Sequence, residues 1–183
     1  MFSLSLTEFV QLRPLHPEHA EDLLQLVEDS RSTLGAWMPW THQMQELIDA
    51  EEFIANATHL YAENGAITVG LWEHHRLAGV IGFHEINWRS FHAQVGYWLG
   101  HSFEGRGLMT LALRPLIDHA FMEMELNRIE IRCAVTNTRS RGVPERLGFT
   151  LEGIVRQAEK LDDGYIDHAL YGLLRQEWNF RRD

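Results

Sequence analysis

Residues 97–108 read YWLGHSFEGRGL and join a predicted strand to a predicted helix. Valine, tyrosine and tryptophan favour a strand over residues 93–99, and apolar residues at helical spacing continue to about residue 125. A glycine-rich loop that opens a helix presents backbone N–H groups and the positive end of the helix dipole to phosphate oxygens. Gly105 and Gly107 lack a Cβ, which allows a pyrophosphate to approach the backbone closely. The alternative for G-x-G alone is an ordinary turn with positive φ.

Two familiar phosphate-binding motifs do not match this loop. A P-loop requires a lysine after its second glycine, and no lysine follows Gly105 or Gly107. A dinucleotide-binding fingerprint requires a third glycine at position 110, where this chain has Thr110. The sequence therefore favours a loop that binds the pyrophosphate of a different cofactor.

Outside the loop, hydrophobic patterning predicts strands with helices between some of them. The predicted strands cover residues 7–15, 66–72, 77–86, 93–99, 128–135, 149–157 and 165–174. The predicted helices begin near Pro17 and near Leu47, follow the glycine loop, and cover residues 140–147. Gly65 is the expected stop of the second helix, and Asp163-Gly164 is an expected turn. This order predicts an α/β fold with a mixed sheet, in a single domain over residues 1–183.

Composition and charge limit the function classes. The chain has 183 residues, of which 45% are hydrophobic and 23% charged, as in a globular protein. Its 16 Lys and Arg against 26 Asp and Glu give a net charge of −10, which disfavours general nucleic-acid binding. No apolar run approaches the roughly 18 residues of a membrane span, and the first ten residues lack the basic start of a signal peptide. A single cysteine, Cys133, is typical of a cytoplasmic protein.

Several motifs together resemble the GNAT superfamily of N-acetyltransferases. Residues 97–108 are similar to its coenzyme A pyrophosphate loop, although Glu104 and Met109 depart from the superfamily pattern Q/R-x-x-G-x-G/A. LNRIEIR at 126–132, Asn137 with Ser140, and PERLGFTLEG at 144–153 resemble the branch of the bacterial ribosomal-protein serine/alanine N-terminal acetyltransferases. The resemblance covers nearly the whole chain. It implies the GNAT fold, a central mixed sheet flanked by about four helices.

The resemblance also implies an acetyl-CoA site. Backbone amides of residues 105–110 would hold the pyrophosphate, with the charge of Arg106 nearby, and the pantetheine arm would lie beside residues 97–99. Asn137 would bind the same arm, or cap the following helix, or do both. The implied binding residues are Tyr97, Trp98, Leu99, Glu104, Gly105, Arg106, Gly107, Leu108, Met109, Thr110, Asn137 and Ser140.

Acetyl transfer from a thioester to an amine requires a base for the amine, stabilisation of the oxyanion and an acid for the thiolate. Many superfamily members use a tyrosine acid at the position where this chain has Pro144, which has no proton to give. The ribosomal branch implies Ser140 as the acid and Glu159, nineteen residues later, as the base. A backbone N–H near Trp98 would polarise the acetyl carbonyl. The alternatives are a helix-capping role for Ser140 and a solvated carboxylate at Glu159.

The sequence contains other candidate groups. Glu85 and His84, at the end of a predicted strand, are alternative bases. The eleven histidines include no H-E-x-x-H motif, so no metal site is expected. The segment with Trp37 and Trp40 is interpreted either as a lip over the acceptor site or as packing, between the first two helices or in a dimer.

The leading hypothesis is a cytoplasmic acetyl-CoA-dependent N-acetyltransferase that modifies a protein N-terminal α-amine, such as that of a ribosomal protein. The alternatives are an acetyltransferase for small amines and a non-catalytic acyl-CoA-binding regulatory module. No nucleic-acid or membrane partner is expected, and the resemblance suggests a homodimer.

Overall fold

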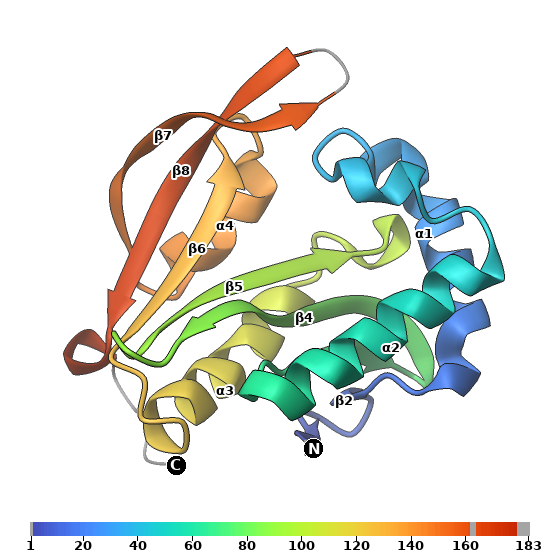
Figure 1. The fold of residues 1–183 in the computed structure, drawn as a ribbon, viewed down its shortest axis with the longest axis horizontal. Helices are drawn as coiled ribbons and strands as arrows, with labels where there is room; N and C mark the ends of the chain where they lie inside the picture. Colours follow the sequence, from blue (N-terminus) through green and yellow to red (C-terminus); the bar gives the residue numbers. More distant parts are fainter. Residues whose placement is uncertain (1, 162–163, 179–183) are drawn as a thin grey trace. The chain divides into compact units, whose positions relative to one another are not determined.

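The structure, a computed structural model, describes residues 2–161 and 164–178. It contains eight strands in one mixed sheet, in the order β1-β2-β3-β4-β5-β6-β8-β7, and four α-helices (Figure 1). The strands are β1 (Leu4–Ser5), β2 (Val10–Pro14), β3 (Thr68–Glu73), β4 (Arg76–Asn87), β5 (His92–Leu99), β6 (Arg128–Ala134), β7 (Thr150–Leu161) and β8 (Gly164–Leu174). The helices are α1 (Ala20–Leu34), α2 (Leu47–Asn64), α3 (Leu108–Met122) and α4 (Thr138–Arg146), with short 3₁₀ turns at Pro17–His19, Pro39–His42, His101–Phe103 and Arg175–Glu177.

Packing divides the chain into two compact units, which are described separately. Unit 1 comprises Met1–Gly82 and Tyr97–Leu108, and unit 2 comprises Phe83–Gly96 and Met109–Asp183. The prediction of a single domain stays a prediction.

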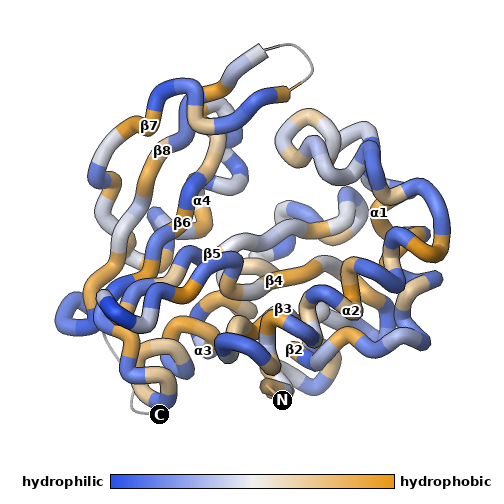
Figure 2. The backbone as a smooth tube through the Cα atoms, in the orientation of Figure 1, coloured by the Kyte–Doolittle hydropathy of each residue, from blue (hydrophilic) through white to orange (hydrophobic). Residues whose placement is uncertain are grey.

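In unit 1, β1 to β4 pair in sequence order and antiparallel. The β3–β4 hairpin turns on His74 and His75, whose φ angles of 46° and 65° match a two-residue type I′ turn. The Gly100 N–H donates to the Ala78 carbonyl at 2.9 Å, so the end of β5 lies beside the start of β4. Apolar residues of β3 and β4 supply much of the buried core (Figure 2).

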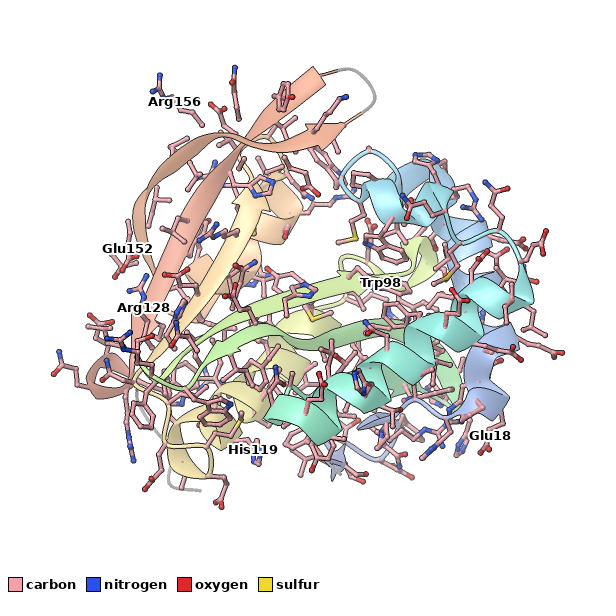
Figure 3. All side chains as sticks on the ribbon, in the orientation of Figure 1. Glu18, Trp98, His119, Arg128, Glu152 and Arg156 are labelled. Atoms are coloured by element: carbon pink, nitrogen blue, oxygen red, sulfur yellow. The ribbon has the colours of Figure 1, made fainter. Side chains whose placement is uncertain are left out.

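In unit 2, β5 pairs with β6 in parallel, whereas β6–β8 and β8–β7 are antiparallel. One parallel pair among antiparallel ones confirms the predicted mixed sheet. Most apolar side chains of α3 are buried, whereas Leu111 and Met122 are exposed, and the helix continues through Pro115. An ion pair between Arg128 on β6 and Glu152 on β7 lies on this sheet (Figure 3).

The predicted element order is confirmed, but several boundaries differ. The first strand was expected over residues 7–15, whereas β2 covers only Val10–Pro14 and β1 is an additional short strand. The Thr7 hydroxyl accepts hydrogen bonds from the N–H groups of Phe9 and Val10, and this local turn separates the two strands. Gly65, at φ 77°, ends α2 as predicted.

Elements of unit 2 are also shifted. α4 begins at Thr138 rather than at residue 140, and β7 continues past residue 157 to Leu161 across an irregular segment. Asp163 of the expected turn lies outside the described residues, and Gly164 is the first residue of β8. Among the helices of the described residues, none combines the length and apolar character that crossing a membrane requires.

Candidate active site

The glycine loop adopts a conformation that requires its glycines. Gly105 and Gly107 have φ angles of 73° and 76°, in the left-handed region that other residues rarely adopt. A Cβ at either position would meet no atom within 4 Å, so backbone conformation rather than crowding selects glycine. Helix α3 starts at Leu108 directly after the loop, and the first N–H groups of a helix have no intrahelical partner. The loop therefore has the form of an anion-binding helix start.

Arg106 is bound by a carboxylate that the sequence analysis did not single out. Its guanidinium donates two hydrogen bonds to Glu73 at the end of β3, at 2.7 and 2.6 Å. The Glu73 side chain is 10% exposed and that of Arg106 49%. This bidentate pair fixes the loop to β3 and compensates the charge that was expected to serve a pyrophosphate.

A second arginine lies at the first turn of α3. The Arg146 guanidinium, on α4, donates hydrogen bonds to the Thr110 hydroxyl from Nε at 3.2 Å and from a terminal nitrogen at 3.1 Å. Within the described part of the chain, Arg146 has no carboxylate partner. Its position in the motif at 144–153 was the only signal that could have marked it.

The other residues expected near the donor occupy β5 and the ends of the loop. Tyr97, Trp98 and Leu99 are the last residues of β5. Glu104 precedes the glycines and donates its N–H to the His101 carbonyl at 3.3 Å. The side chains of Leu108 and Met109 are buried at the start of α3.

Trp40 contacts two elements of unit 1. Its ring lies 5.7 Å from the ring of Trp98 on β5 and 6.1 Å from that of Phe53 on α2. The Arg31 guanidinium, on α1, donates to the Thr41 and Met44 carbonyls and so holds the same segment. The packing interpretation of Trp40 is thereby supported, with β5 and α2 as its neighbours. The role as an acceptor-site lip stays a prediction.

The start of α4 places Asn137 and Ser140 together. Asn137 is the N-cap, since its Oδ1 accepts a hydrogen bond from the Ser140 N–H at 3.1 Å. Ser140 is therefore not the cap of this helix, and its hydroxyl donates to the Cys133 thiol at 3.2 Å. The capping alternative for Asn137 is confirmed and that for Ser140 is wrong.

A part-buried polar network holds α4 against β8 and the end of β6. The Tyr171 hydroxyl on β8 donates to Glu145 at 2.6 Å and accepts from Arg141 at 2.9 Å. Arg141 also donates to the Val135 carbonyl at 3.0 Å. Burial and the bond to Glu145 raise the pKa of Tyr171, so the hydroxyl stays protonated at neutral pH.

Glu159 has a partner that the sequence analysis did not identify. Its Oε2 lies 3.2 Å from Nε2 of His168, which is on the neighbouring strand β8. Glu159 and Ser140 form no hydrogen bond with each other, and they contact different neighbours. A base and an acid act on different atoms of the reaction, so they need not touch.

The alternative bases lie on β4 in unit 2. The His84 imidazole rests on Gly96 of β5, where a Cβ would come within 1.5 Å of Nε2. The residue as a whole is exposed, but the chain around the ring removes part of its water, which lowers the pKa of His84. His84 is consequently neutral at pH 7 and able to accept a proton. Glu85 is exposed.

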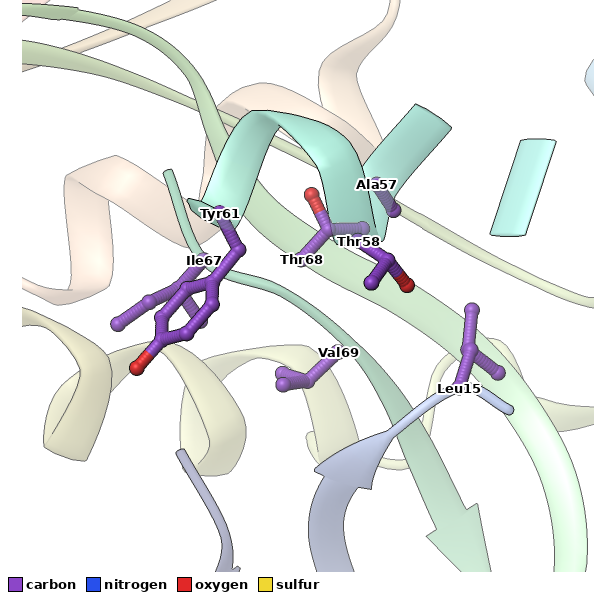
Figure 4. A pocket seen from close by; sticks show the side chains of 7 residues that line it. All are labelled: Leu15, Ala57, Thr58, Tyr61, Ile67, Thr68 and Val69. Atoms are coloured by element: carbon purple, nitrogen blue, oxygen red, sulfur yellow. The ribbon is translucent and has the colours of Figure 1, made fainter. Parts of the chain in front are cut away.

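The described residues form no metal site, and a hollow in unit 1 contains no base. No group of three or more histidine, cysteine, aspartate or glutamate side chains there is placed to hold a metal ion. A hollow beside α2 and β3 is lined by apolar and hydroxyl-bearing residues: Leu15, Ala57, Thr58, Tyr61, Ile67, Thr68 and Val69 (Figure 4). It contains no carboxylate or imidazole that could act as a base.

The chain matches known acetyltransferases over most of its length. Residues 10–150 match the acetyltransferase (GNAT) domain family. The ribosomal-protein-serine acetyltransferase of Escherichia coli (strain K12) is 32% identical over 169 residues, which are 92% of this chain and 94% of that protein. Bacillus subtilis (strain 168) YdaF, provisionally named a ribosomal N-acetyltransferase, is 36% identical over 97% of this chain and 98% of its own.

Solved structures agree with these matches. RimL, a ribosomal-protein α-N-acetyltransferase solved with coenzyme A disulfide-linked to one of its cysteines, superposes with a TM-score of 0.91 at 28% identity. The match covers 96% of this chain and 99% of that one. MccE, a microcin C7 self-immunity acetyltransferase solved with acetyl-CoA and AMP, gives 0.87 at 28% identity over 92% and 94% of the two chains. The fold, the glycine loop and these matches together show that the chain belongs to the GNAT family of N-acetyltransferases.

Proposed function

We propose that this N-acetyltransferase transfers acetyl from acetyl-CoA to the α-amine of a protein N-terminus, of the kind found on ribosomal proteins. The observation that carries the proposal is the loop at residues 104–110, whose left-handed glycines open α3. The full-length likeness to a ribosomal-protein-serine acetyltransferase supports the choice of acceptor. A cytoplasmic location, expected from the single cysteine, and a homodimer, suggested by the resemblance, stay predictions.

The donor would be held by backbone groups more than by side chains. The amides of residues 105–110 bind the pyrophosphate, because helix-start N–H groups favour anions. Arg106 serves mainly to fix this loop through Glu73, and Arg146 supplies positive charge at Thr110. The pantetheine arm pairs with residues 97–99 of β5. The Oδ1 of Asn137 is engaged by Ser140, so its amide nitrogen is the group that donates to this arm.

The reaction forms a carbon–nitrogen bond and breaks the carbon–sulfur bond. The amine must lose protons, and the leaving thiolate must gain one. Glu159 takes a proton from the acceptor ammonium, directly or through water. The free amine nitrogen bonds to the acetyl carbon and the carbon–sulfur bond breaks. The second proton of that nitrogen passes to the leaving thiolate through the Ser140 hydroxyl, which gives one proton and regains one, or through water while Ser140 hydrogen-bonds the thiolate. The N–H near Trp98 stabilises the charge on the acetyl oxygen. Because an α-amine has a pKa of about 8, the base has only a modest task at neutral pH.

A small-molecule acceptor is the second candidate function. The observation that favours it is the likeness to MccE, which was solved with acetyl-CoA and AMP. The net charge of −10 suits a cationic acceptor of either kind and does not distinguish between them.

Release of the coenzyme A thiol from acetyl-CoA, measured with two panels of acceptors, tests the proposal. One panel holds short peptides that begin with serine, alanine or methionine, and the other holds small amines, including a nucleotide that carries a primary amine. We expect turnover on the peptides and little on the small amines. Turnover confined to the small amines would overturn the proposed acceptor and leave the acetyltransferase activity intact.

A further inference from the structure

We propose that His168 is a positioning residue that holds the Glu159 carboxylate ready to accept the acceptor's proton. The inference rests on the proposed function, in which Glu159 is the base. It starts from the 3.2 Å contact between His168 Nε2 and Glu159 Oε2, which joins two strands at the edge of the unit 2 sheet. No family motif in the sequence marks His168.

An irregularity in β7 brings the two residues within reach. Val155 on β7 pairs with His168 on β8, and continuing that register unchanged would place Glu159 opposite Gly164. At about 3.4 Å per residue, Glu159 would then lie roughly 14 Å along the strand from His168. The register shifts between Val155 and Glu159, so Glu159 instead pairs with Ile166. Glu159 thereby becomes the diagonal neighbour of His168, and the Cα atoms of such neighbours are typically about 7–8 Å apart.

A bulge between Val155 and Glu159 produces this register shift, and a hydrogen bond to β8 stabilises it. Gln157 lies inside it with φ 51°, a left-handed conformation that costs a residue other than glycine about 1 kcal/mol or more. The Asp167 carboxylate, next to His168 on β8, accepts a hydrogen bond from the Gln157 N–H at 2.8 Å. Bulges commonly re-aim a side chain near an active site, and here the re-aimed side chain is Glu159.

Relative exposure decides which member of the pair faces the acceptor. The Glu159 side chain is 38% exposed, whereas that of His168 is 15% exposed. The carboxylate is thus the accessible group and the imidazole its support. With a proton on Nε2, His168 donates to Oε2 and leaves Oε1 to receive the proton of the acceptor amine. This arrangement limits rotation of the carboxylate, which otherwise must be fixed during each turnover.

Steady-state kinetics of single and double variants test the proposal on the full-length protein. His168→Phe keeps a similar ring volume and loses the hydrogen bond, and we expect kcat to fall about tenfold or more with KM for acetyl-CoA unchanged. His168→Gln can still donate to Glu159 and should recover most of the rate. In a Glu159→Gln background, His168→Phe should have little further effect, because the group it positions is already gone.

The chain offers a matched control in His59 and Glu63, an exposed pair on α2 with the same 3.2 Å separation. His59→Phe should leave kcat unchanged, and thermal unfolding of each variant checks that it is folded. If Glu159→Gln lowers kcat while His168→Phe does not, or if the two losses are additive, the positioning role is overturned and the proposed base survives. If Glu159→Gln itself retains kcat, the assignment of the base has failed instead.

Discussion

Two carboxylates with nitrogen partners, one in each unit, differ in what they can do. Glu73 and Arg106 in unit 1 form two hydrogen bonds at 2.7 and 2.6 Å around a nearly buried carboxylate. Glu159 and His168 in unit 2 share one contact at 3.2 Å, and their carboxylate is more than a third exposed. The first partner is a guanidinium, which binds its carboxylate through two hydrogen bonds, and the second is an imidazole, which makes a single contact here.

The difference assigns the two carboxylates to different tasks. Both Glu73 oxygens accept hydrogen bonds from Arg106 and the side chain is only 10% exposed, so Glu73 is poorly placed to take a proton from a substrate and instead holds the glycine loop. Glu159 has one oxygen free of its partner, which a general base requires. Substitutions at the two sites should therefore change different kinetic constants.

The largest expected effect is on the chemical step. Glu159→Gln keeps the shape of the side chain and removes its ability to accept a proton. We expect kcat to fall about 100-fold, the usual contribution of a general base. Thiol-release kinetics with a peptide acceptor measure kcat of the variant. A normal kcat would contradict the role of Glu159 and favour His84 or Glu85 as the base.

The next effect is on donor binding. Glu73→Gln weakens the pair that fixes the loop, and a hydrogen bond to a charged group is worth about 1.5–3 kcal/mol. We expect KM for acetyl-CoA to rise roughly tenfold, the equivalent of ~1.4 kcal/mol, with kcat nearly unchanged. Glu152→Gln is the matched control, because Glu152 also binds an arginine, Arg128, on the sheet of unit 2. An equal rise in both variants would show a general loss of structure rather than an effect on the loop.

A smaller effect is expected from the loop glycines themselves. Gly107→Ala forces a Cβ into a left-handed conformation at φ 76°, at a cost of about 1 kcal/mol. KM for acetyl-CoA should rise several-fold. Isothermal titration should show a similar rise in the dissociation constant of coenzyme A. Gly153→Ala is the comparison: the site has equal open space and no positive φ, and we expect no change.

The smallest effect concerns acid stability. The hydrogen bond from Arg128 lowers the pKa of Glu152 below its usual value of 4.5. A lowered folded-state pKa stabilises the fold above pH 4.5, and that contribution is lost as pH falls further. Glu152→Gln should therefore flatten the dependence of the unfolding temperature on pH below 4.5. An unchanged slope in thermal scans from pH 3 to 6 would contradict this account of the pair.

Much of the fold could be predicted because its signals are local. The glycine loop, the apolar face of α3 and the stop at Gly65 are each encoded by residues close in sequence. The division between β1 and β2 depends on one hydroxyl, that of Thr7, which hydrophobic patterning does not register. The extension of β7 depends on pairing with β8 across a bulge, and no single-strand pattern predicts that.

The partners of the candidate residues could not be predicted for a related reason. Glu73 precedes Arg106 by 33 residues, and Arg146 follows Thr110 by 36, so neither pair has a local spacing to recognise. Helix capping by Asn137 was an alternative that the sequence offered, because a cap acts on the residues that directly follow it; its bond with the Ser140 N–H was not itself predicted. His168 was missed since its contact with Glu159 exists only through the register shift.

The most direct test is to measure kcat and KM for acetyl-CoA in Glu159→Gln and Glu73→Gln under the same conditions with one peptide acceptor. The account predicts a crossed result: Glu159→Gln lowers kcat and keeps KM, whereas Glu73→Gln raises KM and keeps kcat. A loss of the same constant in both variants would contradict the separation of the base from the loop support.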